Sequence, residues 1–309
     1  MKRRHFFSAK TMKRRHFLWI SLFAVAGCTT ATSTSTKQAS TLKTISQPQK
    51  LRFAVSDVKG LEDLQKDYGA LRTLLEEILE KKVEFFPVES YIAAAAALQL
   101  NQADLVFTGP SEYVVMLART NAIPIVAIER QKYYCVIATQ LGSGVQSVAE
   151  LKGGKTIAMW DVGSTSGHLG PTKLLIDAGL DPKTDLKIEL LGKQGLPALQ
   201  KGNVAAWGGS ISRYDKFLKS NGLSEKDFPI LAKGPTLPAD PFVASSQLDP
   251  AFVEQIQQRL LQNQNRILKA IALADGSKFE GARMVQVNDT DYNMIRDVYK
   301  AIGQGNSVS

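Results

Sequence analysis

The sequence contains few of the residues that commonly hold metals and cofactors. Its 309 residues include two cysteines and three histidines. Two of the histidines lie within the first 16 residues, and the third is His168. Zinc sites combine several Cys and His side chains at short spacings, so we expect no zinc site. No aspartate-rich loop indicates a calcium site, although a site built from carboxylates alone stays open. We therefore predict a protein without a metal or another cofactor.

The chain also lacks an apolar run long enough to span a membrane, which takes roughly 20 residues. Residues 17–27 form a shorter apolar run that follows a basic segment and precedes Cys28. This order is typical of a secretory signal peptide, and we predict that residues 1–27 are removed. "MKRRHF" occurs twice, so the start codon is either Met1 or Met12. The segment "RRHFL" is compatible with twin-arginine export as well as general secretion.

A strong net charge is missing once this peptide is set aside. The whole chain has 38 basic and 29 acidic side chains, a formal charge of +9. Residues 1–27 hold seven of the basic side chains and no acidic one, which leaves 31 basic against 29 acidic, or +2. Because nucleic-acid binding depends on clustered basic surface, we predict no nucleic-acid partner.

The end of the signal peptide, "VAGC" at 25–28, resembles the lipobox of bacterial lipoproteins. The resemblance implies cleavage before Cys28, a lipid on its sulfur, and a position in the periplasm at the outer face of the cytoplasmic membrane. An ordinary cleavage site before a cysteine is the alternative. Residues 28–49 are rich in Ser, Thr, Gln and Lys and predict a flexible tether, because they have too few apolar side chains to form a core.

From residue 50 onward, apolar strand-like runs alternate with amphipathic helical stretches. In the predicted helix at 61–82, for example, Leu and Ile recur at helical spacing. Such alternation is typical of α/β folds with mixed, mostly parallel sheets flanked by helices. Long helices are predicted at 249–274 and 289–302.

The alternation restarts after residue 142, which predicts two lobes. One lobe would contain residues 50–138 and 243–309, and the other residues 139–242. The chain would cross between them near 138–142 and 234–244, through two strands that act as a hinge. The last helices would return to the first lobe.

Ligands in open α/β sheets bind beyond the carboxyl ends of strands, where helices begin. Three segments fit this rule: "GPSEYV" (109–114), "DVGSTSGHLGP" (161–171) and "AWGGSIS" (206–212). In the second, Pro171 predicts a helix that begins near Gly170, and residues 164–167 would form the turn that leads into it. Hydroxyls and free backbone N–H groups at a helix entrance suit an anion. A Ser/Thr capping turn that binds nothing is the alternative.

Several segments together resemble the solute-binding proteins of phosphonate and phosphite ABC importers, the PhnD-like group. They are "FTGPSEYV", "YYCVIAT", "SVAELKGGKTIAM", "GSTSGHLGP" and "LPALQKGNVAAWGGSISRYD". The resemblance runs from residue 51 to 302. It implies a type II periplasmic binding protein with two lobes that close on a ligand, no enzymatic activity, and partners that are ABC permease and ATPase subunits.

Matched position by position, the resemblance implies that the hydroxyls at 164–166 donate hydrogen bonds to phosphorus-bound oxygens. Tyr91 and Tyr113 would contribute hydroxyls from the opposite lobe, and His168 would lie beside the ligand. A packing role for Tyr113 and a surface position for His168 are the alternatives. The predicted ligand-binding residues are Tyr91, Ser111, Tyr113, Ser164, Thr165, Ser166, Gly167, His168 and Ser210.

At Ser210 this sequence differs from the family members that bind aminoalkylphosphonates. Those proteins typically have a carboxylate there, which meets the ammonium group of the ligand. An unpaired buried cation is costly, so we predict a small ligand without an amine: phosphite, methylphosphonate or phosphate. Trp207 would either narrow the pocket or belong to the core.

Other functions stay open at this point. Ser166 near His168 is compatible with a hydrolase, but the G-x-S-x-G elbow of one large class is absent and no orienting acid is indicated. The same fold could bind sulfate, another oxyanion or an organic anion, and a sulfate site would offer donors only. A sensor subunit would share the pocket and differ in its partner. The chain has no Walker motif, so transport energy would come from partner subunits.

Overall fold

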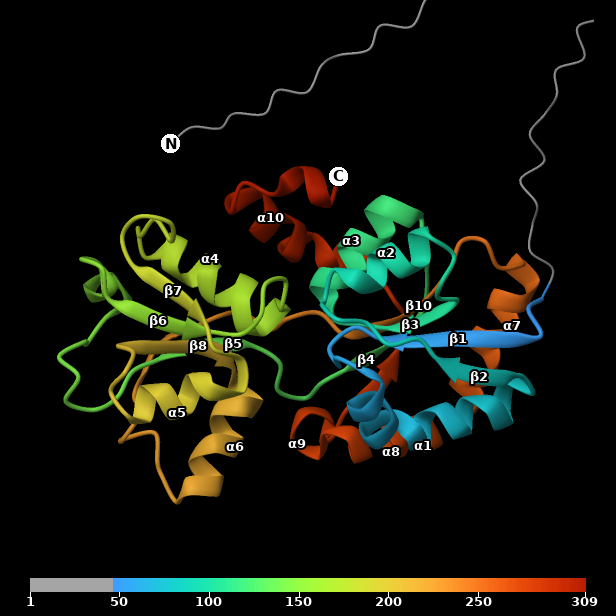
Figure 1. The fold of residues 1–309 in the computed structure, drawn as a ribbon, viewed down its shortest axis with the longest axis horizontal. Helices are drawn as coiled ribbons and strands as arrows, with labels where there is room; N and C mark the ends of the chain where they lie inside the picture. The colour runs from blue at the N-terminus through green and yellow to red at the C-terminus, as the bar shows by residue number, and fades with distance from the viewer. Residues whose placement is uncertain (1–46) are drawn as a thin grey trace, which may run out of the picture. The chain divides into compact units, whose positions relative to one another are not determined.

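The computed structural model describes residues 47–309, which form two α/β lobes (Figure 1). The predicted signal peptide, the lipobox and the tether up to residue 46 lie outside the described residues. Within the described part, no helix is both long and apolar enough to cross a membrane.

The first lobe is built on a six-stranded sheet with the strand order β11-β4-β10-β3-β1-β2. β1 pairs in parallel with β2 and β3, whereas β4, β10 and β11 make antiparallel pairs. The sheet is mixed, as predicted, but parallel pairs do not predominate. Its strands are β1 (Lys50–Val55), β2 (Lys82–Phe85), β3 (Leu105–Phe107), β4 (Ile123–Glu129), β10 (Asp240–Ala244) and β11 (Arg283–Val285).

Helices cover both faces of this sheet (Figure 1). The core on one face includes α1, α7 and α8, and the core on the other includes α2, α3 and α10. The leucines and isoleucines that predicted the first helix are buried there. The helices are α1 (Leu61–Leu79), α2 (Ala93–Gln99), α3 (Pro110–Thr120), α7 (Pro250–Gln262), α8 (Gln264–Ala274), α9 (Gly276–Phe279) and α10 (Asn293–Ala301), with short turns η4 (Asp289–Tyr292) and η5 (Gly305–Ser307).

The second lobe has a five-stranded sheet in the order β7-β6-β8-β5-β9, with α4 on one face and α5 and α6 on the other. β6 pairs in parallel with β7 and β8, and β5 runs antiparallel to β8 and β9. The strands are β5 (Cys135–Ala138), β6 (Thr156–Met159), β7 (Lys187–Leu190), β8 (Ala206–Ser210) and β9 (Ile230–Lys233). The helices are η1 (Val148–Leu151), η2 (Thr165–Leu169), α4 (Gly170–Asp177), η3 (Gly192–Gln194), α5 (Gly195–Gln200) and α6 (Ile211–Asn221).

The chain passes between the lobes twice, through residues 130–134 and 234–239. These segments run side by side, because Leu237 N donates to Tyr133 O at 2.7 Å. The predicted boundaries at 138/139 and 242/243 need correction. β5 belongs to the second sheet and all of β10 to the first, because strand pairing, rather than the apolar pattern along the chain, assigns a strand to a sheet.

Two further predictions about the C-terminal region are corrected by the structure. The helix predicted at 249–274 is interrupted at Asn263, whose backbone leaves the helical region with ψ of 17° and whose side-chain Nδ2 donates to Arg259 O at 2.9 Å. Asn competes in this way for backbone acceptors. The last helix, α10, does not return to the first lobe alone, because it contacts α3 of the first lobe and α4 of the second (Figure 1).

Candidate functional site

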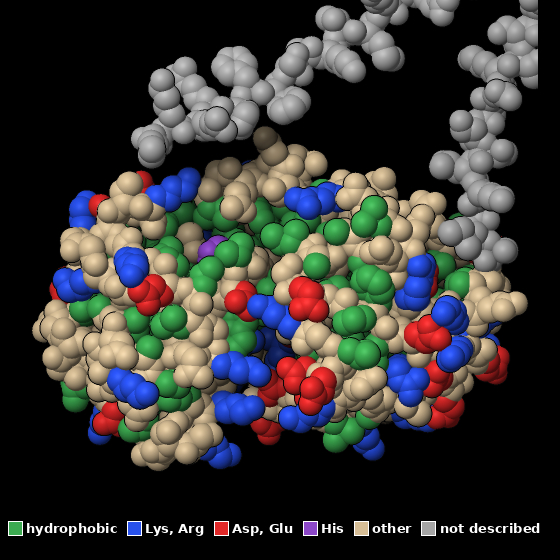
Figure 2. Space-filling view, in the orientation of Figure 1, with side chains coloured by type: hydrophobic (Ala, Val, Ile, Leu, Met, Phe, Trp, Pro, Cys, Tyr) green, Lys and Arg blue, Asp and Glu red, His purple; other side chains and the backbone are tan. Residues whose placement is uncertain are grey.

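A narrow cleft with a cavity volume of about 30 Å³ lies between the lobes and is partly open to solvent. Figure 2 shows Lys and Arg side chains beside Asp and Glu around a hollow near the middle of one face. From the first lobe and the crossings, the lining residues are Asp57, Tyr91, Gly109, Glu112, Arg130, Tyr133, Asp240, Asp275 and Lys278. From the second lobe they are Ser164, Thr165, Ser166, Ser210, Ser212 and Arg213.

The hydroxyl row at 164–166 lies in the cleft and is at most 5% exposed. The predicted helix begins at Gly170, but the segment before it is a π-helical turn, η2, rather than a loop. Trp160 N donates to Gly167 O at 2.8 Å and folds this segment back on the end of β6. Because the first amides of a helical segment have no acceptor within it, the start of η2 offers donors beside the hydroxyls.

Arg213 adds a positive charge to the same wall of the cleft. It lies in the first turn of α6, directly after β8, where Ser210 Oγ accepts from Arg213 N at 3.4 Å. Its guanidinium carbon lies 3.9 Å from the centroid of the Trp160 ring, a stacking arrangement that holds the side chain in place. Among the described residues, no carboxylate forms an ion pair with Arg213, so its charge remains available to an anion.

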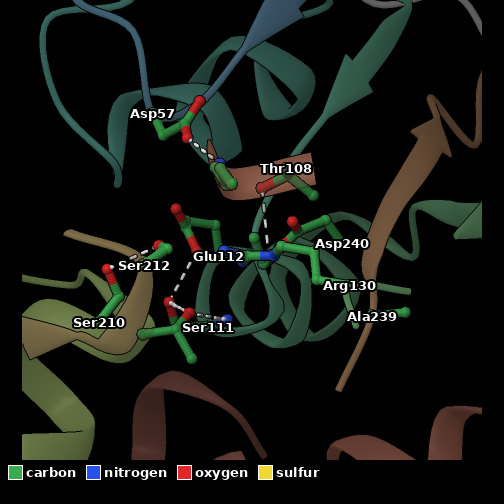
Figure 3. Close-up of polar contacts among 12 residues, drawn as sticks. Asp57, Thr108, Ser111, Glu112, Arg130, Ser210, Ser212, Ala239 and Asp240 are labelled. Carbon is green, nitrogen blue, oxygen red and sulfur yellow. Dashed lines mark hydrogen bonds and ion pairs between the residues drawn. The ribbon is translucent and has the colours of Figure 1, made fainter. Parts of the chain in front are cut away.

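The opposite wall carries charges that are mostly paired with one another (Figure 3). Lys278 forms an ion pair with Asp57, and Arg130 Nη2 lies 2.7 Å from Asp240 Oδ1. Burial by itself would raise the pKa of Asp57, but Lys278 together with the charges of Arg213 and Arg130 more than offsets this, and the pKa is lowered. For Asp240 burial dominates, and its pKa is raised despite Arg130.

These carboxylates correct one premise of the sequence analysis. Ser210 does line the cleft, but carboxylates reach the cleft from the first lobe. The absence of a carboxylate at position 210 therefore does not leave the cleft without acidic groups. Position 210 lies on the second-lobe wall of the cleft. Asp57 and Asp240 belong to the opposite wall and come from distant parts of the chain.

Glu112 is the acidic residue of this wall without a cationic partner among the described residues. It is 5% exposed, and its carboxyl contacts the hydroxyls of Ser111 and Ser56 at 2.7 and 3.2 Å (Figure 3). Burial raises its pKa to about 7, although a hydrogen bond that the ionised carboxylate would accept from Ser111 acts in the opposite direction. A carboxyl with this pKa can be neutral or charged near neutral pH.

The structure brings together five of the nine predicted ligand-binding residues: Tyr91, Ser164, Thr165, Ser166 and Ser210. The other four do not line the cleft. Ser111 instead bonds to the second lobe, with its Oγ 2.6 Å from Gly163 O. Gly167 packs on Trp160, so closely that an added Cβ would lie 2.4 Å from Trp160 Cβ.

The predictions for Tyr113 and His168 are corrected in the same way. Successive helical residues point about 100° apart, so when Glu112 faces the cleft, Tyr113 faces away. Its hydroxyl donates to Asp289 Oδ1 at 2.9 Å, and its ring lies 4.5 Å from that of Tyr292. Burial lowers the pKa of His168, and its Nδ1 has no hydrogen-bond partner among the described residues.

Several lining residues were missed by the sequence analysis. The rule that ligands bind beyond strand ends points to Asp57 after β1 and to Arg130 after β4, and could have found both. It also points to Arg213 after β8. Asp240 begins a strand and Lys278 lies in the short helix α9, so no local pattern marks either of them.

Two α/β lobes, two adjacent crossings and a polar cleft between the lobes define a type II periplasmic binding protein. Residues 53–292 match the family described as "ABC transporter, phosphonate, periplasmic substrate-binding protein". The chain belongs to this family and is a periplasmic substrate-binding component of an ABC importer.

Individual relatives agree with this assignment. The chain is 24% identical over 282 residues to the phosphate-import protein PhnD of Mycolicibacterium smegmatis, a match that covers 83% of this chain and 87% of the relative. PhnD1 from Prochlorococcus marinus in complex with methylphosphonate superposes with a TM-score of 0.69 at 20% identity, covering 84% of this chain and 100% of that one. XAC2383 from Xanthomonas citri bound to ATP gives 0.71 at 15% identity, covering 84% and 99%. At these identities the structural likeness establishes the fold.

Proposed function

We propose that this protein captures a small phosphorus oxyanion between its lobes and delivers it to a membrane permease. The observation that carries the proposal is the composition of the second-lobe wall, where three hydroxyls in a row lie with Arg213 and without a carboxylate. Donors and a cation held in a buried cleft complement the oxygens and the charge of such an anion. We propose Tyr91, Ser164, Ser166, Ser210 and Arg213 as ligand contacts, and Thr165 through its backbone N–H, because its hydroxyl is bonded to Ser111.

The charges of the opposite wall favour a ligand without an amine. Asp57 and Asp240 are each paired with a cation, so an ammonium group could pair with either one only by displacing Lys278 or Arg130. Breaking a buried pair such as Arg130–Asp240 costs about 3–5 kcal/mol, and the more exposed Lys278–Asp57 pair costs less. Glu112 has no cationic partner among the described residues, but burial raises its pKa and so disfavours the charged form that an ammonium group would need. The phosphate-import relative and the methylphosphonate complex of PhnD1 support the same ligand class. We propose phosphite, methylphosphonate or phosphate as the ligand.

Isothermal titration calorimetry of the purified protein tests this proposal. The panel is phosphite, methylphosphonate, phosphate, 2-aminoethylphosphonate and sulfate. We expect the tightest binding for one of the first three, with dissociation constants for the last two higher by at least about tenfold, which corresponds to ~1.4 kcal/mol. Preference for 2-aminoethylphosphonate would overturn the argument from the paired carboxylates. Preference for sulfate would assign the site to another oxyanion.

We further propose that the protein is a lipoprotein anchored through Cys28 at the outer face of the cytoplasmic membrane. The order of basic segment, apolar run and "VAGC" supports this. Expression with a radiolabelled fatty acid should label the protein and leave Cys28→Ala unlabelled and released from membranes. Equal membrane retention of the two would contradict the anchor.

A further inference from the structure

Three oxygen atoms lie within hydrogen-bond distance of the Ser111 hydroxyl. Ser111 Oγ is 2.6 Å from Gly163 O, 2.6 Å from Thr165 Oγ1 and 2.7 Å from Glu112 Oε2. Ser111 and Glu112 begin α3 in the first lobe, whereas Gly163 and Thr165 belong to the second lobe. This cluster therefore joins the two lobes beside the proposed ligand site.

The number of protons in the cluster constrains the state of Glu112. A serine hydroxyl has one proton to donate and can accept two hydrogen bonds. Gly163 O is a carbonyl oxygen and can only accept, so it takes the proton of Ser111. Both remaining contacts must then be donated to Ser111 Oγ. Thr165 can donate, because the hydrogen bond that its Oγ1 accepts from Ser111 N at 3.0 Å leaves its own proton free. Glu112 can donate only if its carboxyl is protonated.

The second oxygen of the carboxyl fits the same assignment. Ser56 Oγ donates to Glu112 Oε1 at 3.2 Å and lies 2.9 Å from Thr108 Oγ1. One carboxyl oxygen thus accepts a hydrogen bond while the other donates one, which is the pattern of a neutral carboxylic acid.

An ionised Glu112 would leave one contact without a proton. Its Oε2 would compete with Gly163 O for the single proton of Ser111, and two oxygens would face each other at 2.6–2.7 Å. Ser111 is fully buried and Thr165 is 4% exposed, so water cannot take the missing place. Unpaired buried polar atoms cost free energy. Ionisation of Glu112 would therefore favour separation of the two lobes at this contact.

We propose that Glu112 is a positioning residue whose carboxyl must be protonated for the lobes to close, so that ligand capture is coupled to uptake of a proton. This inference rests on the proposed function, because the proton would regulate how tightly the proposed site binds its ligand. Ligand affinity is therefore the quantity to measure. The coupling acts through Ser111, which bonds to Gly163 and to Thr165 of the hydroxyl row.

The direction of the pH effect follows from the two states of the cleft. In the closed protein the pKa of Glu112 is about 7, raised by burial, and an opened cleft returns the carboxyl toward its ordinary 4.5. The added affinity is complete below the pKa of the open state, falls as pH rises to about 7, and is constant above it. The charged and titratable groups that share the cleft with Glu112 or interact with it from other elements are Asp57, Tyr91, Arg130, Tyr133, Arg213, Asp240, Asp275, Lys278 and Tyr299.

The test compares wild-type protein with Glu112→Gln, whose amide donates and accepts like the neutral acid. Dissociation constants for the preferred oxyanion are measured by calorimetry from about pH 5 to about pH 8, a range that spans the ordinary and raised pKa values. Ligand protonation, His168 and the other acidic groups contribute to both proteins and cancel in the ratio of their dissociation constants. We expect wild type to weaken relative to Glu112→Gln by about tenfold or more across this range. Glu254→Gln, an exposed residue of α7, is the matched control and should keep the wild-type profile.

A ratio that stays flat across this range would overturn the proposal. If Glu112→Gln does not fold, carbon-13 NMR of glutamate carboxyls in ligand-bound wild type provides the second measurement. A buried carboxyl that titrates near pH 7 supports the proposal, and ordinary titration of every glutamate refutes it. Failure of the proposed function is separate, because in that case no member of the oxyanion panel binds wild type at any pH.

Discussion

The Nη2 atom of Arg130 lies 2.7 Å from Oδ1 of Asp240, and both side chains are at most 5% exposed. Arg130 directly follows β4, where the chain leaves the first lobe, and Asp240 begins β10, where it returns. The guanidinium carbon of Arg130 also lies 3.1 Å from the centroid of the Tyr133 ring in the first crossing. One ion pair thus connects the two crossings and at the same time lines the ligand cleft.

Removing one partner of this pair should destabilise the protein. Asp240→Ala leaves the Arg130 charge buried and unpaired, and we expect a loss of about 3–5 kcal/mol in the free energy of unfolding. Arg130→Met combined with Asp240→Leu removes both charges and should cost less. Denaturant unfolding followed by circular dichroism measures both. A double variant less stable than Asp240→Ala would contradict the role of the unpaired charge.

The hydroxyl row should supply much of the ligand affinity. Replacing both Ser164 and Ser166 with alanine removes two donors, and each hydrogen bond to a charged group contributes roughly 1.5–3 kcal/mol. We expect the dissociation constant to rise by about a hundredfold or more, with the melting temperature little changed. Ser220→Ala, on the exposed face of α6, is the control. An unchanged dissociation constant in the double variant would exclude the row from the ligand site.

Arg213 should contribute charge and geometry separately. Arg213→Gln removes the positive charge, and calorimetry should show affinity lower by about 1.5–3 kcal/mol. Arg213→Lys keeps the charge but loses the planar fork and the stacking on Trp160, so its affinity should fall between the two. Arg283→Gln, an exposed residue of β11, should bind like wild type. Equal affinity of wild type and Arg213→Gln would mean that the ligand does not reach this residue.

Gly234, directly after β9, packs against the buried thiol of Cys135. An added Cβ at Gly234 would lie 2.6 Å from Cys135 Sγ, so we expect Gly234→Ala to cost about 1–3 kcal/mol of stability. In a Cys135→Ala background the sulfur is absent and the same change should cost less. Thermal unfolding of the four proteins gives the coupling. Equal losses in both backgrounds would show that the sulfur is not the cause.

Much of the fold was predictable because local patterns repeat along the chain. The helical spacing of Leu and Ile predicted α1. Pro87 predicted the end of β2, because proline has no N–H to donate to a neighbouring strand. The boundaries between lobes were less accurate. An apolar run such as β5 suits either sheet, and only its hydrogen-bonded neighbours decide which sheet it joins.

The candidate site was likewise predictable in part. The row at 164–166 is contiguous and lies at a strand end, so the sequence by itself indicated it, together with the family and the two-lobed α/β architecture. Side-chain direction was not visible at that level, and Tyr113 and His168 were expected in the cleft although they lie outside it.

The sequence alone therefore determined the class of protein and one wall of its cleft, because both depend on residues close together in the chain. Tertiary structure decided the other wall, where Asp57, Asp240 and Lys278 meet across more than 200 residues. It also raised the pKa of Glu112, because the burial of this carboxyl depends on which elements folding brings together.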